Sequence, residues 1–218
     1  MPFMPATKLA REFYARATLT VARELIGMHL VHQNSHGRQV GRIVETEAYQ
    51  GPKDLAAHSS RGRTERTEVM FGPGGFSYVY LIYGMWDCMN VVTATVDVPQ
   101  AVLIRALEPI SGITRTTHGP GLLCRALGID RRMSGVDLTG QVLWIERPGD
   151  YRPPRLARAT RIGVDYAGAW AAKPWRFFDQ DSPYVSTVSA ARRRQALAKA
   201  LNSAPPHSPG PLPPAPLP

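Results

Sequence analysis

Residues 77–94 read SYVYLIYGMWDCMNVVTA, two runs of β-branched and aromatic residues on either side of YGMWD. Such runs favour strands, so we predict two strands joined as a hairpin. Residues 101–109, AVLIRALEP, predict another strand, and residues 29–31 and 38–49 predict two more around a turn at residues 35–37, SHG. Because strands joined by short turns pair antiparallel, we predict an α+β fold around a curved, mainly antiparallel sheet with a protruding hairpin.

The rest of the chain predicts flanking helices and a single domain. Residues 11–28 carry apolar side chains at largely helical intervals and end near Gly27, which predicts one or two helices. A chain of 218 residues, 44% of them hydrophobic, suffices for one substantial core. We expect a compact domain over residues 1–202, with a short helix at residues 190–201. Residues 203–218 have eight prolines in sixteen positions, and we expect a disordered tail there.

Charge and composition narrow the setting of the protein. Lys and Arg number 26 against 17 Asp and Glu, and the resulting net charge of +9 suits a polyanionic partner without identifying one. Cys88 and Cys124 lack the close spacing of a zinc site or a redox pair. The first residues are charged where a signal peptide needs an apolar run, and no run approaches the about 20 apolar residues of a membrane span. We therefore expect a soluble cytoplasmic protein without membrane contact.

The strand at residues 43–49, IVETEAY, carries the candidate chemistry. Strand alternation places Glu45, Glu47 and Tyr49 on one face and the residues between them on the other. Acids on an apolar strand are costly to bury without partners. They therefore either pair with arginines or form a working site, and the pattern alone leaves both interpretations open.

Four segments resemble the alkyladenine, or 3-methyladenine, DNA glycosylase family in order and spacing. They are VETEAYQGPKDLAAHSSRGR (44–63), YVYLIYGMWDCMN (78–90), VLIRALEP (102–109) and GPGLLCRALGI (119–129). The resemblance runs from about Phe13 to near Ser186, roughly four fifths of the chain. Because several separate motifs are in register, it is specific.

The resemblance implies that Glu47 is the general base that deprotonates a water for attack on the sugar C1′ carbon. Hydrolysis of an N-glycosidic bond passes through an oxocarbenium-like sugar, which a carboxylate can stabilise, and this chemistry needs no metal or cofactor. A stacked base is out of reach, so the target must be flipped out of the duplex. The resemblance places Tyr49 and Tyr80 on the two sides of the flipped base, with His58 at its edge. Taken alone, such tyrosines are more often core, and a loop histidine is usually solvated.

Three further residues take their roles from the resemblance. Tyr83, before Gly84, would be the wedge that fills the space of the flipped nucleotide; otherwise it is an exposed turn tyrosine. Asn90 would lie beneath the base and clash with the exocyclic amine of normal guanine. Arg105 would contact a phosphate or order the water; otherwise it pairs with Glu45 or Glu108.

Some positions depart from the family pattern or imitate other motifs. Leu122 stands where a basic residue is common, which puts one DNA backbone contact in doubt. Ala17 stands where a proline is frequent. The glycines of FGPGG at residues 71–75 lack the GK[ST] of a phosphate loop, so we interpret them as a loop.

Two other functional classes remain open at this stage. Glu45 and Glu47 could hold Mg²⁺ in a nuclease, with Lys53 or Asp54 completing the site. Alternatively, the protein could bind lesions without turnover. The resemblance favours a monofunctional glycosylase that acts on double-stranded DNA from the minor groove and leaves an abasic site. A monomer is our default expectation. The expected substrate is above all 3-methyladenine, with 7-methylguanine, hypoxanthine and ethenoadenine as further candidates. We expect the protein to be associated with the nucleoid if it is bacterial and to be nuclear if it is eukaryotic.

Overall fold

The strands pair into one sheet, in which every ladder between described strands is antiparallel. A computed structural model describes residues 5–35 and 37–186. Its nine strands follow the order β1-β7-β2-β3-β6-β5-β4, with β9 paired to β3 and β8 to β9. The strands are β1 (Thr7–Lys8), β2 (His29–Asn34), β3 (Gly37–Tyr49), β4 (Ser77–Ile82), β5 (Trp86–Thr93), β6 (Gln100–Ser111), β7 (Leu143–Arg147), β8 (Leu156–Ala159) and β9 (Arg176–Asp179). The predicted α+β fold with a large antiparallel sheet is confirmed.

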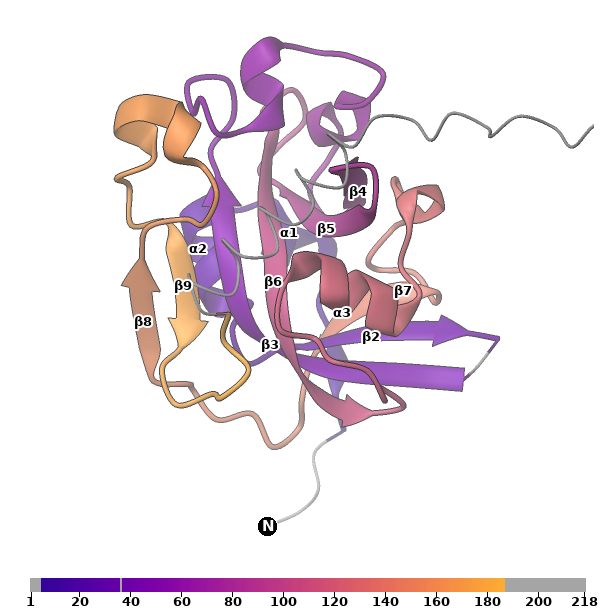
Figure 1. The fold of residues 1–218 in the computed structure, drawn as a ribbon. Helices are drawn as coiled ribbons and strands as arrows, with labels where there is room; N and C mark the ends of the chain where they lie inside the picture. The colour runs from indigo at the N-terminus through magenta and orange to yellow at the C-terminus, as the bar shows by residue number, and fades with distance from the viewer. Residues whose placement is uncertain (1–4, 36, 187–218) are drawn as a thin grey trace, which may run out of the picture.

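Helices are few and short, and three of them pack on the sheet. They are α1 (Arg11–Tyr14), α2 (Thr18–Glu24) and α3 (Pro120–Leu127), with 3₁₀ turns η1 (His58–Arg61), η2 (Glu68–Phe71), η3 (Arg131–Met133) and η4 (Asp165–Trp170). The predicted helical stretch at residues 11–28 thus forms two helices. Figure 1 shows the long strands β3 and β6 side by side, with α3 in the foreground. Apolar residues of α2, α3 and the central strands form one buried cluster.

The pairing of β3 with β6 is irregular where the acids lie. Ile43 pairs with Leu107 and Thr46 with Ile104, but between them Glu45 pairs with Ala106. The register therefore shifts on both sides of Glu45, and Arg105 falls between two paired residues of β6. Bulges re-aim side chains and recur beside active sites. On its other edge, the same part of β3 pairs with β9, so the acids lie on an internal strand.

The hairpin of β4 and β5 confirms the predicted pair of strands around YGMWD. Leu81 pairs with Asp87 and Ile82 with Trp86 at its end. Tyr83 and Gly84 both have positive φ, 54° and 68°, which a tight hairpin turn requires. Gly121 of α3 lies against this hairpin: a Cβ built on it would come within 2.7 Å of Trp86 Cε3.

We expect Gly121→Ala to lower the free energy of unfolding. Alanine favours a helix over glycine by about 1 kcal/mol, but overpacking against the rigid indole costs about 1–3 kcal/mol. Urea unfolding measures the difference, with Arg125→Ala on the exposed side of the same helix as the control. A more stable Gly121→Ala protein would show that Trp86 moves aside freely.

Three predicted features fall outside the described residues: the helix at residues 190–201, the tail at 203–218 and the domain boundary at 202. Within the described part of the chain, no helix is long and apolar enough to cross a membrane. Cys88 and Cys124 are both buried free thiols.

Candidate active site

The acids of β3 are fully buried and share one side of the strand. Glu45 and Glu47 are both 0% exposed. The Thr46 hydroxyl, between them, donates instead to the Ala22 carbonyl of α2, 2.8 Å away. Alternation along β3 therefore follows the sequence pattern, and Tyr49 continues the side of the acids, since its hydroxyl meets Glu47.

Glu47 accepts hydrogen bonds at both carboxylate oxygens. The Tyr49 hydroxyl donates to Oε2 at 2.9 Å, and the backbone N–H of Ile162 donates to Oε1 at 2.7 Å. Arg105 Nη1 lies 3.4 Å from Oε1. These groups fix the orientation of the carboxylate, which a general base requires.

Arg105 lies between the two acids rather than at the protein surface. It is 5% exposed, and its Nε is 3.5 Å from Glu45 Oε1. Burial alone would lower the pKa of Arg105, but the Glu47 and Glu45 carboxylates outweigh it and raise that pKa above its ordinary value. The predicted alternative that Arg105 pairs with Glu108 is wrong, because Glu108 Oε2 pairs with Arg42 Nη2, 2.6 Å away.

Glu45 is held from strand β9 and from the end of the described chain. Arg176 Nη1 donates to its Oε1 at 2.8 Å. The backbone N–H of Ser186 donates to Oε2 at 2.8 Å, and the Ser186 hydroxyl does so as well. Arginines therefore pair with both acids, and the working site stays a prediction.

A pocket of about 370 Å³ brings the other predicted residues together, a size typical of ligand sites. Its wall includes six of the seven predicted residues: Tyr49, His58, Tyr80, Tyr83, Asn90 and Arg105. Glu47 is not on the wall and lies behind it, bonded to Tyr49. Leu122, the departure on α3, also lines the pocket and adds an apolar side chain.

His58 is part of an aromatic group on the pocket wall. Its Nδ1 is hydrogen-bonded to the Tyr78 hydroxyl at 2.8 Å. Its ring packs edge to face against the Tyr80 ring, with the two ring centroids 4.4 Å apart. Burial, with smaller contributions from Arg66 and Arg61, lowers the pKa of His58 to about 4. The imidazole is therefore neutral at physiological pH, and the solvated-loop interpretation of His58 is wrong.

We expect His58 to make stability fall as pH drops from 6.5 towards 4. The unfolded chain takes up a proton near pH 6.5, while the folded protein resists it until about pH 4, so acid favours unfolding across this window. Between pH 7 and pH 5 the loss attributable to His58 is about 2 kcal/mol. Urea unfolding at both pH values, on the native protein and on His58→Gln, measures it. Equal losses in the two proteins would contradict a depressed pKa.

Asn90 is fixed in its orientation by the backbone. Its Nδ2 donates to the carbonyls of Tyr78, at 3.0 Å, and Cys88, at 3.5 Å. The residue is 4% exposed and lines the pocket. With the amide nitrogen bound to the backbone, Oδ1 is the atom left to interact with a ligand.

The metal-dependent nuclease interpretation conflicts with how the acids are used. Both Asp54 oxygens accept hydrogen bonds from Arg161, at 2.6 and 2.9 Å. Glu45 is likewise bonded to Arg176 and Ser186. A cation would have to displace buried guanidinium groups, which costs several kcal/mol.

Sequence reasoning missed four contributors to this site. Ile162 supplies a backbone N–H, which leaves no mark in a sequence. Arg176 and Ser186 reach Glu45 from more than 130 positions away. Arg161, which pairs with Asp54 and contacts the Tyr49 ring, gave no signal, and the sequence pointed to Asp54 only as part of a metal site.

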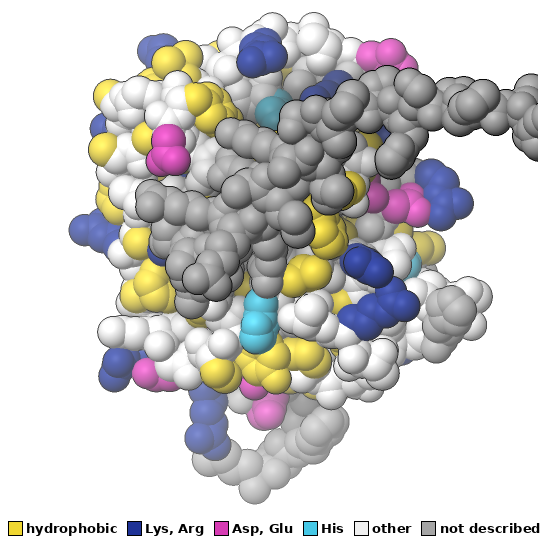
Figure 2. Space-filling view, viewed as in Figure 1, with side chains coloured by type: hydrophobic (Ala, Val, Ile, Leu, Met, Phe, Trp, Pro, Cys, Tyr) yellow, Lys and Arg dark blue, Asp and Glu magenta, His cyan; other side chains and the backbone are white. Residues whose placement is uncertain are grey.

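Lys and Arg side chains surround the face that Figure 2 shows, with acidic and hydrophobic ones interspersed. A fixed carboxylate behind an aromatic pocket is compatible with hydrolysis of a glycosidic bond. The profile of the methylpurine-DNA glycosylase family matches residues 12–183. The chain belongs to the methylpurine-DNA glycosylase family, and it is accordingly a DNA glycosylase and a DNA repair enzyme.

Three bacterial relatives, each provisionally named a 3-methyladenine DNA glycosylase, show the same. The protein from an Anaeromyxobacter species is 54% identical over 182 residues, 82% of this chain and 92% of its own. That from Legionella pneumophila strain Corby is 51% identical, covering 82% of this chain and 98% of its own. That from Myxococcus xanthus is 53% identical, covering 86% and 97%. The chain thus spans nearly the whole length of these relatives.

Proposed function

We propose that the protein flips an alkylated or deaminated purine out of duplex DNA and hydrolyses its N-glycosidic bond, with Glu47 as the general base. The observation that carries this proposal is the fixed Glu47 carboxylate, bonded to Tyr49 and Ile162, behind a pocket lined by Tyr49, Tyr80 and His58. Glu47 takes a proton from water, the water oxygen bonds to C1′, and the base leaves with the bonding electrons. The product is an abasic site.

The pocket residues support distinct steps of this reaction. Tyr49 and Tyr80 offer ring surfaces for the flipped base, and neutral His58 can hydrogen-bond its edge. Oδ1 of Asn90, on an amide fixed by the backbone, would repel the carbonyl oxygen or crowd the exocyclic amine of normal guanine. Tyr83, in the hairpin turn, is the wedge that stacks in place of the extruded nucleotide.

Arg105 acts on Glu47 in this scheme and less on the DNA backbone. A guanidinium that is 5% exposed and flanked by two carboxylates reaches few phosphates. Arg105 does line the pocket, and its Nη1 lies 3.4 Å from Glu47 Oε1. From there it can hold both the Glu47 carboxylate and the attacking water. We therefore assign it to ordering the water.

We further propose a monofunctional enzyme that acts as a monomer on 3-methyladenine, with 7-methylguanine, hypoxanthine and ethenoadenine as additional substrates. A carboxylate that activates water forms no Schiff base, so the DNA strand stays intact. The lesions share a purine ring that fits between two tyrosines. A cationic methylated purine leaves unaided, whereas a neutral one needs a proton at its ring.

Chromatography of free bases from methylated duplex DNA, with EDTA present, tests the proposal. We expect the protein to release 3-methyladenine and to leave unbroken strands that carry abasic sites. Strand breaks that EDTA abolishes would replace the proposal with a metal-dependent nuclease. Binding to lesion duplex without release of any purine would replace it with a lesion-binding module.

A further inference from the structure

A buried ion pair joins the two loops that end at the pocket. Asp54 and Arg161 are 0% and 4% exposed, and their side chains form two hydrogen bonds of 2.6 and 2.9 Å. Asp54 also accepts from the backbone N–H groups of Gln50 and Ala56, both at 3.1 Å, so it organises the loop that leads to His58. A bidentate pair of this kind is geometrically specific.

The guanidinium of Arg161 continues from Asp54 to the backbone and to Tyr49. It donates to the carbonyls of Ala48, at 3.0 Å, and Trp170, at 3.1 Å. The guanidinium carbon, Cζ of Arg161, lies 4.8 Å from the centroid of the Tyr49 ring. Tyr49 lines the pocket and Arg161 does not, so the cation supports the ring from outside the pocket.

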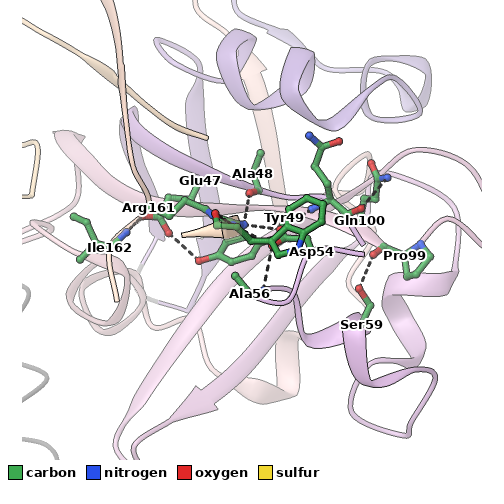
Figure 3. Close-up of polar contacts among 12 residues, drawn as sticks. Glu47, Ala48, Tyr49, Asp54, Ala56, Ser59, Pro99, Gln100, Arg161 and Ile162 are labelled. Atoms are coloured by element: carbon green, nitrogen blue, oxygen red, sulfur yellow. Dashed lines mark hydrogen bonds and ion pairs between the residues drawn. The ribbon is translucent and has the colours of Figure 1, made fainter. Parts of the chain in front are cut away.

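Both hydrogen bonds that Glu47 accepts within the described part of the chain come from groups connected to Arg161, one through the backbone and one through a ring contact. Ile162 directly follows Arg161, and its N–H is the donor to Oε1. Tyr49, whose ring Arg161 contacts, is the donor to Oε2. Figure 3 shows Glu47 between these two donors, with Arg161 and Asp54 beside them.

We propose that Arg161, held by Asp54, is a positioning residue that sets both hydrogen-bond donors of Glu47 and thereby the orientation of the general base. The inference rests on the proposed function, in which Glu47 activates the water. It assigns the ion pair a role in the chemical step. A small apolar cluster of Ala56, Val164 and Ala167 already packs the same two loops together, so these loops have another source of cohesion.

Arg161→Lys tests the proposal, because lysine keeps the charge but loses the planar fork. Misplacement of a catalytic group by about 1 Å can cost about 100-fold, and we expect single-turnover base release to fall by about that factor. Lesion binding, measured in a Glu47→Gln background to prevent turnover, should change little. The acid limb of the pH–rate profile should move to higher pH, because weaker donors stabilise the ionised carboxylate less.

The matched control is Arg42→Lys. Arg42 lies on β3 and bonds two acids, Glu108 at 2.7 Å and Asp179 at 2.8 Å, but it does not line the pocket. We expect it to lower thermal stability while leaving the rate of base release and its acid limb unchanged. Equal effects of the two variants on the rate, or an unmoved acid limb in Arg161→Lys, would overturn the positioning role. If Arg161→Lys fails to fold, Asp54→Asn, of native size, takes its place with the same expected pattern.

A readout without turnover keeps the two proposals apart. Amide hydrogen exchange at Ile162 should accelerate in Arg161→Lys and not in Arg42→Lys, whatever reaction the protein catalyses. Undiminished protection at Ile162 would overturn the positioning role even in an active enzyme. Conversely, lost protection in a protein whose native form releases no base would overturn the proposed function alone.

Discussion

Glu47→Gln is expected to bind lesion-containing duplex DNA as the native protein does and to release base 10²- to 10⁴-fold more slowly, roughly the contribution of a general base. Glutamine has the same shape, and its carbonyl oxygen can accept the Ile162 N–H that now reaches Oε1 at 2.7 Å. Its amide can donate to the Tyr49 hydroxyl, which is able to accept. The substitution therefore removes the basic group while keeping the hydrogen bonds to Ile162 and Tyr49.

Single-turnover release of base from methylated duplex, with binding measured by fluorescence anisotropy, checks this result. Gln50→Glu, at the half-buried residue that directly follows β3, serves as a control for a neutral-to-acid exchange nearby and should leave release largely intact. A Glu47→Gln protein with native rates would remove Glu47 from the mechanism. Loss of binding together with release would instead assign Glu47 to structure.

Arg105→Met is expected to cost about 3–5 kcal/mol of unfolding free energy, because it removes the cation between two buried carboxylates and leaves their charge uncompensated. Typical domains are stable by only about 5–15 kcal/mol, so this loss is a large part of the total. Glu45 and Glu47 are both 0% exposed and cannot recover water without local unfolding. Base release should fall as well, since Glu47 loses a neighbour at 3.4 Å.

The double variant Arg105→Met/Glu45→Gln discriminates between lost charge balance and lost packing. It restores equal numbers of buried acids and arginines around the site, so we expect it to regain part of the stability that Arg105→Met loses. Urea unfolding of the native protein, the two single variants and the double variant gives the coupling free energy directly. A double variant less stable than the single one by the full cost of Glu45→Gln would show that packing dominates.

The strands that build the site were predictable because their patterns are long and regular. Alternation over residues 43–49 gave the shared face of Glu45, Glu47 and Tyr49, and the β-rich runs around YGMWD gave the hairpin. By contrast, strands β8 and β9 have four residues each, too few for a periodic signal. The site lies where one of these short strands, β9, joins β3.

The contacts that orient Glu47 were beyond sequence reasoning for physical reasons. The Ile162 N–H is a backbone group that nearly every residue possesses. Arg105 meets the acids at a point where the register of β3 and β6 shifts, and no pattern announces such a bulge. The roles of His58, Asn90 and Tyr83 come from the resemblance alone and stay predictions, although all three residues line the same pocket.

The balance of buried charge has a consequence for how ionic strength acts on this enzyme. Glu45, Glu47 and Asp54 are matched by Arg105, Arg161 and Arg176, so the interior of the site is neutral in a chain that carries +9 overall. Added salt screens the exposed cations that attract DNA and weakens association, whereas it barely reaches groups sealed from solvent. We therefore expect the affinity for DNA to depend on ionic strength and the rate of bond cleavage to be nearly independent of it. A change in the exposed cations can then alter DNA association without altering the buried charges of the site.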